Sequence, residues 1–117
     1  MLQLAPQQRI LLARDPVDFR RGVDALTAFC RNELGEDPFD GTLFVFKNRA
    51  STSIRSVHYD GQGFWICTKR WSTGRLTWWP AGGEARLLPL AARELAVLLY
   101  NGDPSSARFA PDWRRLP

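Results

Sequence analysis

The feature that most constrains this chain is the alternation of apolar and polar residues between Thr42 and Trp79. β-branched and aromatic residues dominate the runs in this region, and short segments with turn-forming residues separate them. Connections this short require neighbouring strands to run antiparallel. We therefore predict a four-stranded antiparallel meander, with the strands TLFVFK (42–47), IRSVHY (54–59), FWICTKR (64–70) and RLTWW (75–79).

A strand and a helix are expected before the meander. Residues 9–13 predict a short strand that ends before Pro16, because the residue preceding a proline resists the helical conformation. A helix should follow, with Asp18 as its N-cap and with Gly35 beyond its last turn, where glycine accepts the left-handed conformation. Its apolar stripe recurs at three- and four-residue spacing: Phe19, Val23, Leu26, Phe29 or Cys30, and Leu34.

A second helix is expected after the meander, over about residues 90–100. Asn101 and Gly102 should stop this helix, since both residues favour its C-terminal end. Its buried side is predicted to hold Leu95, Leu98 and Leu99. Helices packed on one face of the sheet would make the fold a two-layer α+β domain.

Length and composition fit one globular domain. The chain has 117 residues, 44% of them hydrophobic, which suffices for one core but not for two. We assign residues 1–104 to a single α+β domain and 105–117 to an extended tail, anchored by Phe109 or Trp113. No apolar run approaches the roughly 20 residues that span a bilayer, and the N-terminus lacks the pattern of a signal peptide. We expect a cytoplasmic protein that does not contact a membrane.

Motifs of catalysis and metal binding are missing from the sequence. There is one histidine, His58, and neither Cys30 nor Cys67 has zinc-like spacing to it. No phosphate-binding glycine loop precedes a helix. Asp18 and Asp24, six residues apart, would lie on different faces of a helix, so helix capping and solvation explain them better than a metal site does. We expect no enzyme, no cofactor and no small-molecule substrate.

Positive charge is concentrated on the meander. The whole chain carries +4, but residues 44–80 carry six cations against Asp60 alone, a net charge of +5. The same segment contains four of the five tryptophans. Local charge of this kind bears on partners rather than on fold. The six cations are Lys47, Arg49, Arg55, Lys69, Arg70 and Arg75.

The aromatic residues of the third and fourth predicted strands have two interpretations. In one, Phe64 and Ile66 face the helices, and Trp65 and Trp78 are buried in the core. In the other, Trp71 or Trp79 stacks on nucleobases, while neighbouring cations bind phosphates. Protein interfaces are also rich in tryptophan and arginine, so a protein-docking surface is a further alternative.

Four segments in series resemble the small accessory protein of insertion-sequence-66-type bacterial transposons. This is the TnpB family, which is unrelated to the RNA-guided nucleases that share its label. Together the segments cover most of the chain in the expected order. They are PVDFRRGVDAL (16–26), DPFDGTLFVFKNR (37–49), YDGQGFWICTKRWSTGRLTWWP (59–80) and the leucine-rich LAARELAVLLYNGD (90–103).

The resemblance implies a role in transposition beside a separate, larger transposase. It supplies no catalytic residues, and it makes transposon-end DNA and the transposase the expected partners. One departure concerns the segment after FKNR, where such proteins usually continue with a run of arginine and lysine. This chain has ASTS (50–53) instead, flanked by Arg49 and Arg55.

We therefore predict a non-catalytic accessory factor that binds DNA through a basic, tryptophan-rich hairpin. The predicted phosphate contacts are Lys69, Arg70 and Arg75, with Lys47, Arg49 and Arg55 extending the patch and Trp71 or Trp79 packing against sugar or base. The alternative is a module that binds the transposase, or itself, through exposed tryptophan and an edge strand.

Overall fold

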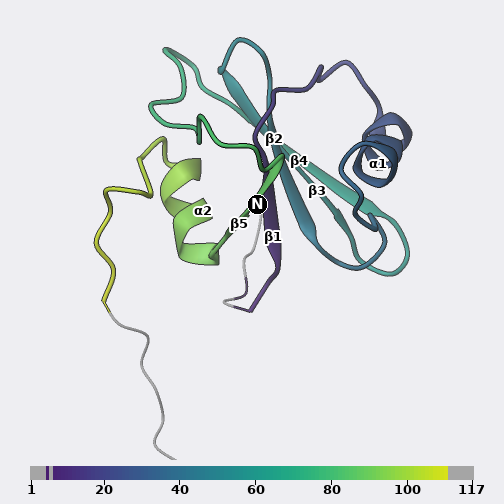
Figure 1. Cartoon of the computed structure of the whole chain (residues 1–117). Helices are drawn as coiled ribbons and strands as arrows, with labels where there is room; N and C mark the ends of the chain where they lie inside the picture. Colours follow the sequence, from purple (N-terminus) through teal and green to yellow (C-terminus); the bar gives the residue numbers. More distant parts are fainter. Residues whose placement is uncertain (1–4, 6, 111–117) are drawn as a thin grey trace, which may run out of the picture.

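The computed structural model describes residue 5 and residues 7–110, which form a five-stranded sheet with two helices (Figure 1). The predicted Trp113 anchor lies outside the described residues. In chain order the elements are β1 (Ile10–Ala13), α1 (Val23–Asn32), β2 (Leu43–Lys47), β3 (Ser53–Tyr59), β4 (Phe64–Arg70), β5 (Leu87–Leu90) and α2 (Ala92–Leu99).

The sheet is mixed, with the strand order β4-β3-β2-β1-β5. β2, β3 and β4 form the predicted antiparallel meander, in which Phe44 pairs with Val57 and Val57 pairs with Ile66. β1 runs parallel to β2, and β5 runs antiparallel to β1. The α+β class is confirmed, as are the first three predicted strands of the meander.

The fourth predicted strand, RLTWW (75–79), is wrong. Residues 71–86 contain no strand. The last backbone hydrogen bond from β4 to the β3 side runs from the Trp71 amide to the Thr52 carbonyl, and the chain departs from the sheet beyond it. In a strand, side chains at odd and even positions would point to opposite faces of the sheet. Here side chains from both odd and even positions pack against the same core. Burial of bulky aromatic surface on one face overrides the strand pattern. These side chains are Trp71, Leu76, Trp78 and Trp79.

β5 contains Pro89 and was not predicted from the sequence. The Arg14 amide donates to the Arg86 carbonyl at 2.9 Å, and hydrogen-bonded pairs alternate with non-bonded pairs along an antiparallel ladder. The Leu11–Pro89 pair is therefore non-bonded, and the proline nitrogen faces away from β1. An edge strand tolerates proline at such a position, because the ladder keeps all its hydrogen bonds.

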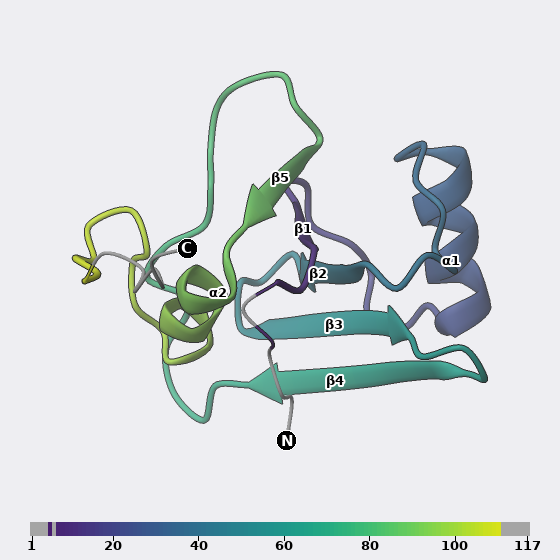
Figure 2. The same cartoon turned by 90° about the horizontal axis from the view of Figure 1, so that it is seen from below.

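The two helices cover opposite faces of the sheet, rather than the single face that we predicted (Figure 2). β1 and β2 read ILLA and LFVFK, almost continuously apolar, and nearly every residue in them is buried. Strands of this kind require cover on both faces. α1 contributes Leu26 and Cys30 to one core, and α2 contributes Leu95 and Leu98 to the other.

Helix α1 is shorter than predicted and does not use Asp18 as its N-cap. The N-cap is Gly22, with extended backbone angles and no side-chain cap. Asp18 instead lies in the preceding turn, where its carboxylate accepts the side-chain and backbone N–H groups of Arg20. These hydrogen bonds lower the pKa of Asp18 to about 2. Past the other end of α1, Gly35 has the predicted positive φ, 68°.

The second helix is confirmed, since α2 lies within the predicted range and buries Leu95 and Leu98 completely. Leu99 is half-buried. Asn101 has the positive φ of a helix stop, 62°, and the Gly102 amide donates to the Val97 carbonyl at 2.9 Å. A Cβ on Gly102 would lie 2.8 Å from a Val97 methyl, so this tight stop requires glycine.

Candidate nucleic-acid interface

The candidate site surrounds the turn between β2 and β3, residues 48–52. The Asn48 side-chain oxygen accepts the Thr52 and Ser53 amides at 2.9 and 3.1 Å, and its amide nitrogen donates to the Thr52 hydroxyl at 2.9 Å. Ser51 adopts a positive φ of 58°. A side chain that bonds three groups of its own turn makes this turn a defined platform rather than a loose loop.

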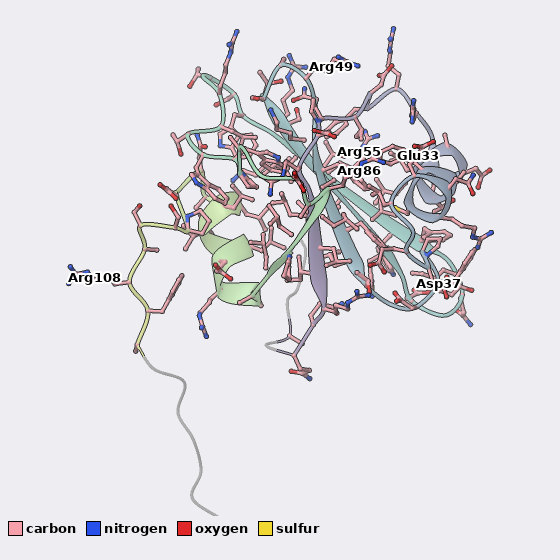
Figure 3. All side chains as sticks on the ribbon, viewed as in Figure 1. Glu33, Asp37, Arg49, Arg55, Arg86 and Arg108 are labelled. Atoms are coloured by element: carbon pink, nitrogen blue, oxygen red, sulfur yellow. The ribbon has the colours of Figure 1, made fainter. Side chains whose placement is uncertain are left out.

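Four of the predicted contact residues lie around this turn. Lys47 ends β2, and its ammonium donates to the Ser51 hydroxyl at 2.8 Å. Arg49 lies within the turn, exposed at the end of the sheet (Figure 3). Arg70 ends β4 and pairs with Ser53, the first residue after the turn. Arg75 precedes Leu76, whose amide donates to the Ser51 carbonyl at 2.8 Å. We call Lys47, Arg49, Arg70 and Arg75 the basic end.

Three of these cations have free charged groups. Arg49, Arg70 and Arg75 are all exposed. Within the described part of the chain, none of their guanidinium groups makes a hydrogen bond or an ion pair. An arginine without a protein partner keeps all five N–H donors for a ligand.

Asn101 positions Arg75, which the sequence analysis did not foresee. The Thr77 amide donates to the Asn101 side-chain oxygen at 2.8 Å, and the Thr77 hydroxyl donates to the Asn101 carbonyl at 2.7 Å. The Asn101 side-chain nitrogen donates to the Arg75 carbonyl at 3.1 Å. Asn101, just beyond the end of α2, therefore holds residues 75–77 in place beside the turn. These residues belong to the irregular segment, residues 71–86, which contains no helix or strand. The NG pair predicted the helix stop but contained no sign of this distant contact.

Lys69 lies beside the basic end, but its ammonium already has a partner. Its Nζ donates to the Leu99 carbonyl at 2.6 Å, at the C-terminus of α2. Cations are stabilised there by the free carbonyl groups and the helix dipole. The ammonium also lies 5.5 Å from the Trp71 ring centre and 5.3 Å from that of Tyr100. Lys69 thus joins β4 to α2, and its predicted phosphate contact remains a prediction.

Arg55 points to the other face of the sheet, towards the segment before α1. Its Nη1 donates to the Phe19 carbonyl at 2.8 Å, and its Nε donates to the Thr68 hydroxyl at 2.9 Å. The guanidinium carbon lies 4.6 Å from the centre of the Phe19 ring. Figure 3 shows Arg55 well away from Arg49. Arg55 is therefore already engaged, unlike Arg70, whose side chain lies on the same face of the sheet.

The tryptophans divide differently from the prediction. Trp71 and Trp79 are half-buried against the core under α2, and the Trp79 indole donates to the Arg14 carbonyl at 3.1 Å. Trp78 packs in the same core, as expected for a core residue. Trp65 is 61% exposed, so its predicted burial is wrong. Trp65 belongs to neither core; it lies on β4, an edge strand of the sheet.

Ile66 was also predicted to face the helices, and it does lie on the face of α1, since it pairs with Val57 and shares that face with Phe64, but no described core residue covers it. It is 42% exposed, whereas Phe64 packs against the core under α1 as expected. Phe64 is covered from the side by Phe39 and Tyr59, whose ring centres lie 5.3 and 5.0 Å away. Aromatic neighbours at the start of β4 thus shield Phe64, while most residues later in the strand are exposed to solvent.

Carboxylates gather at the opposite end of the sheet, where Arg9 is ion-paired. Arg9 forms ion pairs with Glu36 at 3.4 Å and with Asp40 at 3.3 Å. Partial burial raises the pKa of Asp40, but hydrogen bonds from Thr42 and the charge of Arg9 outweigh it and hold that pKa below its usual value. Carboxylates therefore outnumber the cations Arg9 and Arg31 at this end, whereas cations prevail at the basic end. We call Glu36, Asp37, Asp40 and Asp60 the acidic end.

Metal-binding clusters and membrane-crossing helices are both absent from the described residues. Over residues 5 and 7–110, no group of three histidine, cysteine, aspartate or glutamate side chains is placed to hold a metal ion. Within the same residues, no helix has the length and apolarity that crossing a membrane would require.

The fold and the site define a class: a small α+β protein with arginines around one turn at the end of its sheet that have no partner among residues 5 and 7–110. Residues 8–108 match the model of the IS66 Orf2-like family, and the chain belongs to this family. It is therefore an accessory protein associated with transposition.

Two relatives from Sinorhizobium fredii match over 103 residues each. The protein y4jC is 32% identical, covering 88% of this chain and 86% of its own, and y4hO is 33% identical, covering 88% of each; both are named as uncharacterized. No solved structure matches this chain.

Proposed function

We propose that the chain is a non-catalytic accessory factor that binds transposon-end DNA through its basic end, in concert with the element's transposase. The observation that carries the proposal is the gathering around the 48–52 turn of Arg49, Arg70 and Arg75, which have no partner in the described part of the chain. They come from the turn itself, the end of β4 and the irregular segment, and the folded chain brings them together.

Phosphate is the ligand that this arrangement suits best. A guanidinium fork matches two phosphate oxygens, and several such groups on one surface follow a nucleic-acid backbone. The acidic end would repel the same backbone and so would orient the molecule on it. Lys47 adds charge beside the turn while bonded to Ser51. The Trp71 ring, partly exposed beside Lys69, offers a surface for a sugar or base at the rim.

The departure from the family pattern bears on how tightly the chain should bind DNA. Where the resemblance leads one to expect a run of arginine and lysine, the turn carries only Arg49. Because each phosphate contact adds to both affinity and salt dependence, few contacts predict modest affinity and a shallower salt dependence than a longer basic run would give.

The test is fluorescence anisotropy with a labelled transposon-end duplex at about 50 and 200 mM salt. The wild-type chain should bind at low salt. The triple variant Arg49→Gln/Arg70→Gln/Arg75→Gln should bind about tenfold or more weakly, with a salt slope reduced by about 0.9 for each phosphate that is no longer neutralised.

A matched control removes three charges elsewhere, as Arg31→Gln/Arg93→Gln/Arg108→Gln. These residues lie on α1, on α2 and in the following segment, away from the turn. The control has the same net charge as the triple variant, so a general charge effect would weaken both alike. Equal losses of affinity in the two variants, or no wild-type binding at low salt, would refute the proposed site.

A further inference from the structure

Among the described residues, β4 is an edge strand with no strand along its outer side. It occupies one end of the strand order and extends over seven residues, Phe64–Arg70 (Figure 2). It contains no proline, and most of its residues are exposed, including Trp65 and Ile66. A long, flat edge that carries exposed apolar side chains is a template for pairing with another strand.

The pairing of β3 with β4 determines which backbone groups point outward. The Trp71 amide donates to the Thr52 carbonyl, and the Asp60 amide donates to the Gly63 carbonyl, both at 3.0 Å. Since bonded and non-bonded pairs alternate, odd-numbered residues of β4 direct their N–H and C=O groups at β3. The even-numbered residues direct theirs away from the sheet: Phe64, Ile66, Thr68 and Arg70.

We propose that this edge pairs with β4 of a second copy of the chain, antiparallel and centred on Cys67. In that register Ile66 lies opposite Thr68 of the second copy, and Phe64 lies opposite Arg70. Every outward-facing residue of the strand then has a hydrogen-bonding partner. A shift by two residues in either direction leaves an end residue, Phe64 or Arg70, facing a position outside the partner strand.

The side chains are complementary in the same register. Arg70 lies opposite Phe64, and on the other face Lys69 lies opposite Trp65, so each cation is paired in register with an aromatic residue. No two like charges lie directly opposite each other. The exposed Trp65 and Ile66 are shielded from water where the strands join, which supplies an apolar driving force. This complementarity favours a second copy over an unrelated strand.

The other edge of the sheet lacks these properties. β5 has four residues, and Pro89 turns its ring nitrogen, which has no hydrogen, to the outside. Proline on an edge blocks the addition of a strand. The dimer therefore uses one edge only and closes as a symmetric pair.

Oxidative cross-linking tests the register directly. Directly opposed residues at a non-bonded antiparallel position have Cα atoms about 4.5 Å apart, within the range of a disulfide. With copper phenanthroline as oxidant, two Cys67 thiols should lose two electrons and two protons and form one intermolecular disulfide. Cys30 is buried, and burial raises the pKa of its thiol to about 12, so it should not react.

The expected product is a covalent dimer that survives in Cys30→Ala and disappears in Cys67→Ser. The same reaction run at rising dilution separates specific pairing from random collision, since only the paired thiols cross-link efficiently at low concentration. Failure of Cys67 to cross-link would overturn the register. A dimer formed through Cys30 would do the same.

A second experiment tests the pairing itself without the thiol. Ile66→Pro removes an outward N–H and leaves the bonds to β3 intact, while Ile66→Val keeps that N–H and a similar shape. Sedimentation should show a dimer for the wild type and Ile66→Val, and a monomer for Ile66→Pro. Circular dichroism checks that Ile66→Pro is folded. A wild-type monomer, or a folded Ile66→Pro dimer, would refute the proposal, and neither outcome depends on DNA binding.

Discussion

The arginines at the two ends of the sheet differ in their contacts. At the acidic end, Arg9 is shared between Glu36 and Asp40 and also donates to Thr42. At the basic end, Arg49, Arg70 and Arg75 project from a well-ordered turn without a protein partner within the described residues. The comparison teaches that charge at the acidic end is neutralised locally, whereas charge at the basic end is held out on a defined turn, as the proposed contact with DNA requires.

The support of the basic end depends mainly on uncharged groups. Asn48 holds the 48–52 turn, Asn101 holds the segment of Arg75, and Lys69 joins β4 to α2. The two asparagines therefore perform at the basic end the structural work that the ion pairs perform at the acidic end. This division makes the two ends separable by mutation.

The largest effect on stability is expected from Asn101→Gly. Glycine keeps the positive φ but loses the side-chain bonds to Thr77 and Arg75. At about 0.5–1.5 kcal/mol for each hydrogen bond, the free energy of unfolding should fall by about 1–3 kcal/mol, measured by urea denaturation. Asn101→Ala should cost about 1 kcal/mol more, because alanine disfavours positive φ. If Asn101→Gly were as stable as the wild type, the clamp would have no structural role.

A smaller effect should distinguish Arg9 from Arg49. Arg9→Gln should lower the free energy of unfolding by about 0.5–1 kcal/mol, less at high salt, because it breaks two partly exposed ion pairs. Arg49→Gln should change it by no more than about 0.5 kcal/mol while weakening DNA binding. Thermal or urea unfolding of both variants at low and high salt measures the difference. Equal destabilisation by the two substitutions would contradict the contrast between the ends.

The smallest effect is spectroscopic and concerns Asp60, at the acidic end. Backbone N–H groups of Gln62 and Gly63, and the Trp65 indole N–H at 2.7 Å, hold the pKa of Asp60 below its usual value. The ionised carboxylate therefore stabilises the folded state above the ordinary aspartate pKa of about 3.9. This contribution is lost as the pH falls through the lower pKa of the folded state.

Tryptophan fluorescence should report this titration. The wild-type chain should show an emission change below about pH 4 as the bond to Trp65 breaks, and Asp60→Asn should lack that step. The difference between the two chains isolates Trp65 from the other tryptophans. A step of equal size in both chains would show that Asp60 does not control the indole.

Much of the fold could be predicted from local patterns, and the failures share one cause. Alternation predicted the strands 42–47, 54–59 and 64–70, and three- and four-residue spacing predicted both helices. RLTWW has the alternation of a strand, yet side chains from both its odd and its even positions pack into one core. A proline such as Pro89 is compatible with a strand only at the edge of a sheet. The edge position of β5 follows from the strand order, which the sequence does not give.

The candidate site was predicted in part for the same reason. The excess of positive charge located a basic segment, and Lys47, Arg49, Arg70 and Arg75 do lie around one turn. Arg55 and Lys69 were indistinguishable from them in the sequence. Their hydrogen bonds to the carbonyls of Phe19 and Leu99 join positions 36 and 30 residues apart.

By itself, the sequence determined the strands of the meander, both helices, the family and the excess of cations over residues 44–80. These properties depend on residue type and near neighbours. Only the tertiary structure decided which cations stay free, which tryptophans are buried, which faces the helices cover and which edge stays open. Each of those outcomes depends on contacts between residues far apart in the chain, and a local pattern carries no record of them.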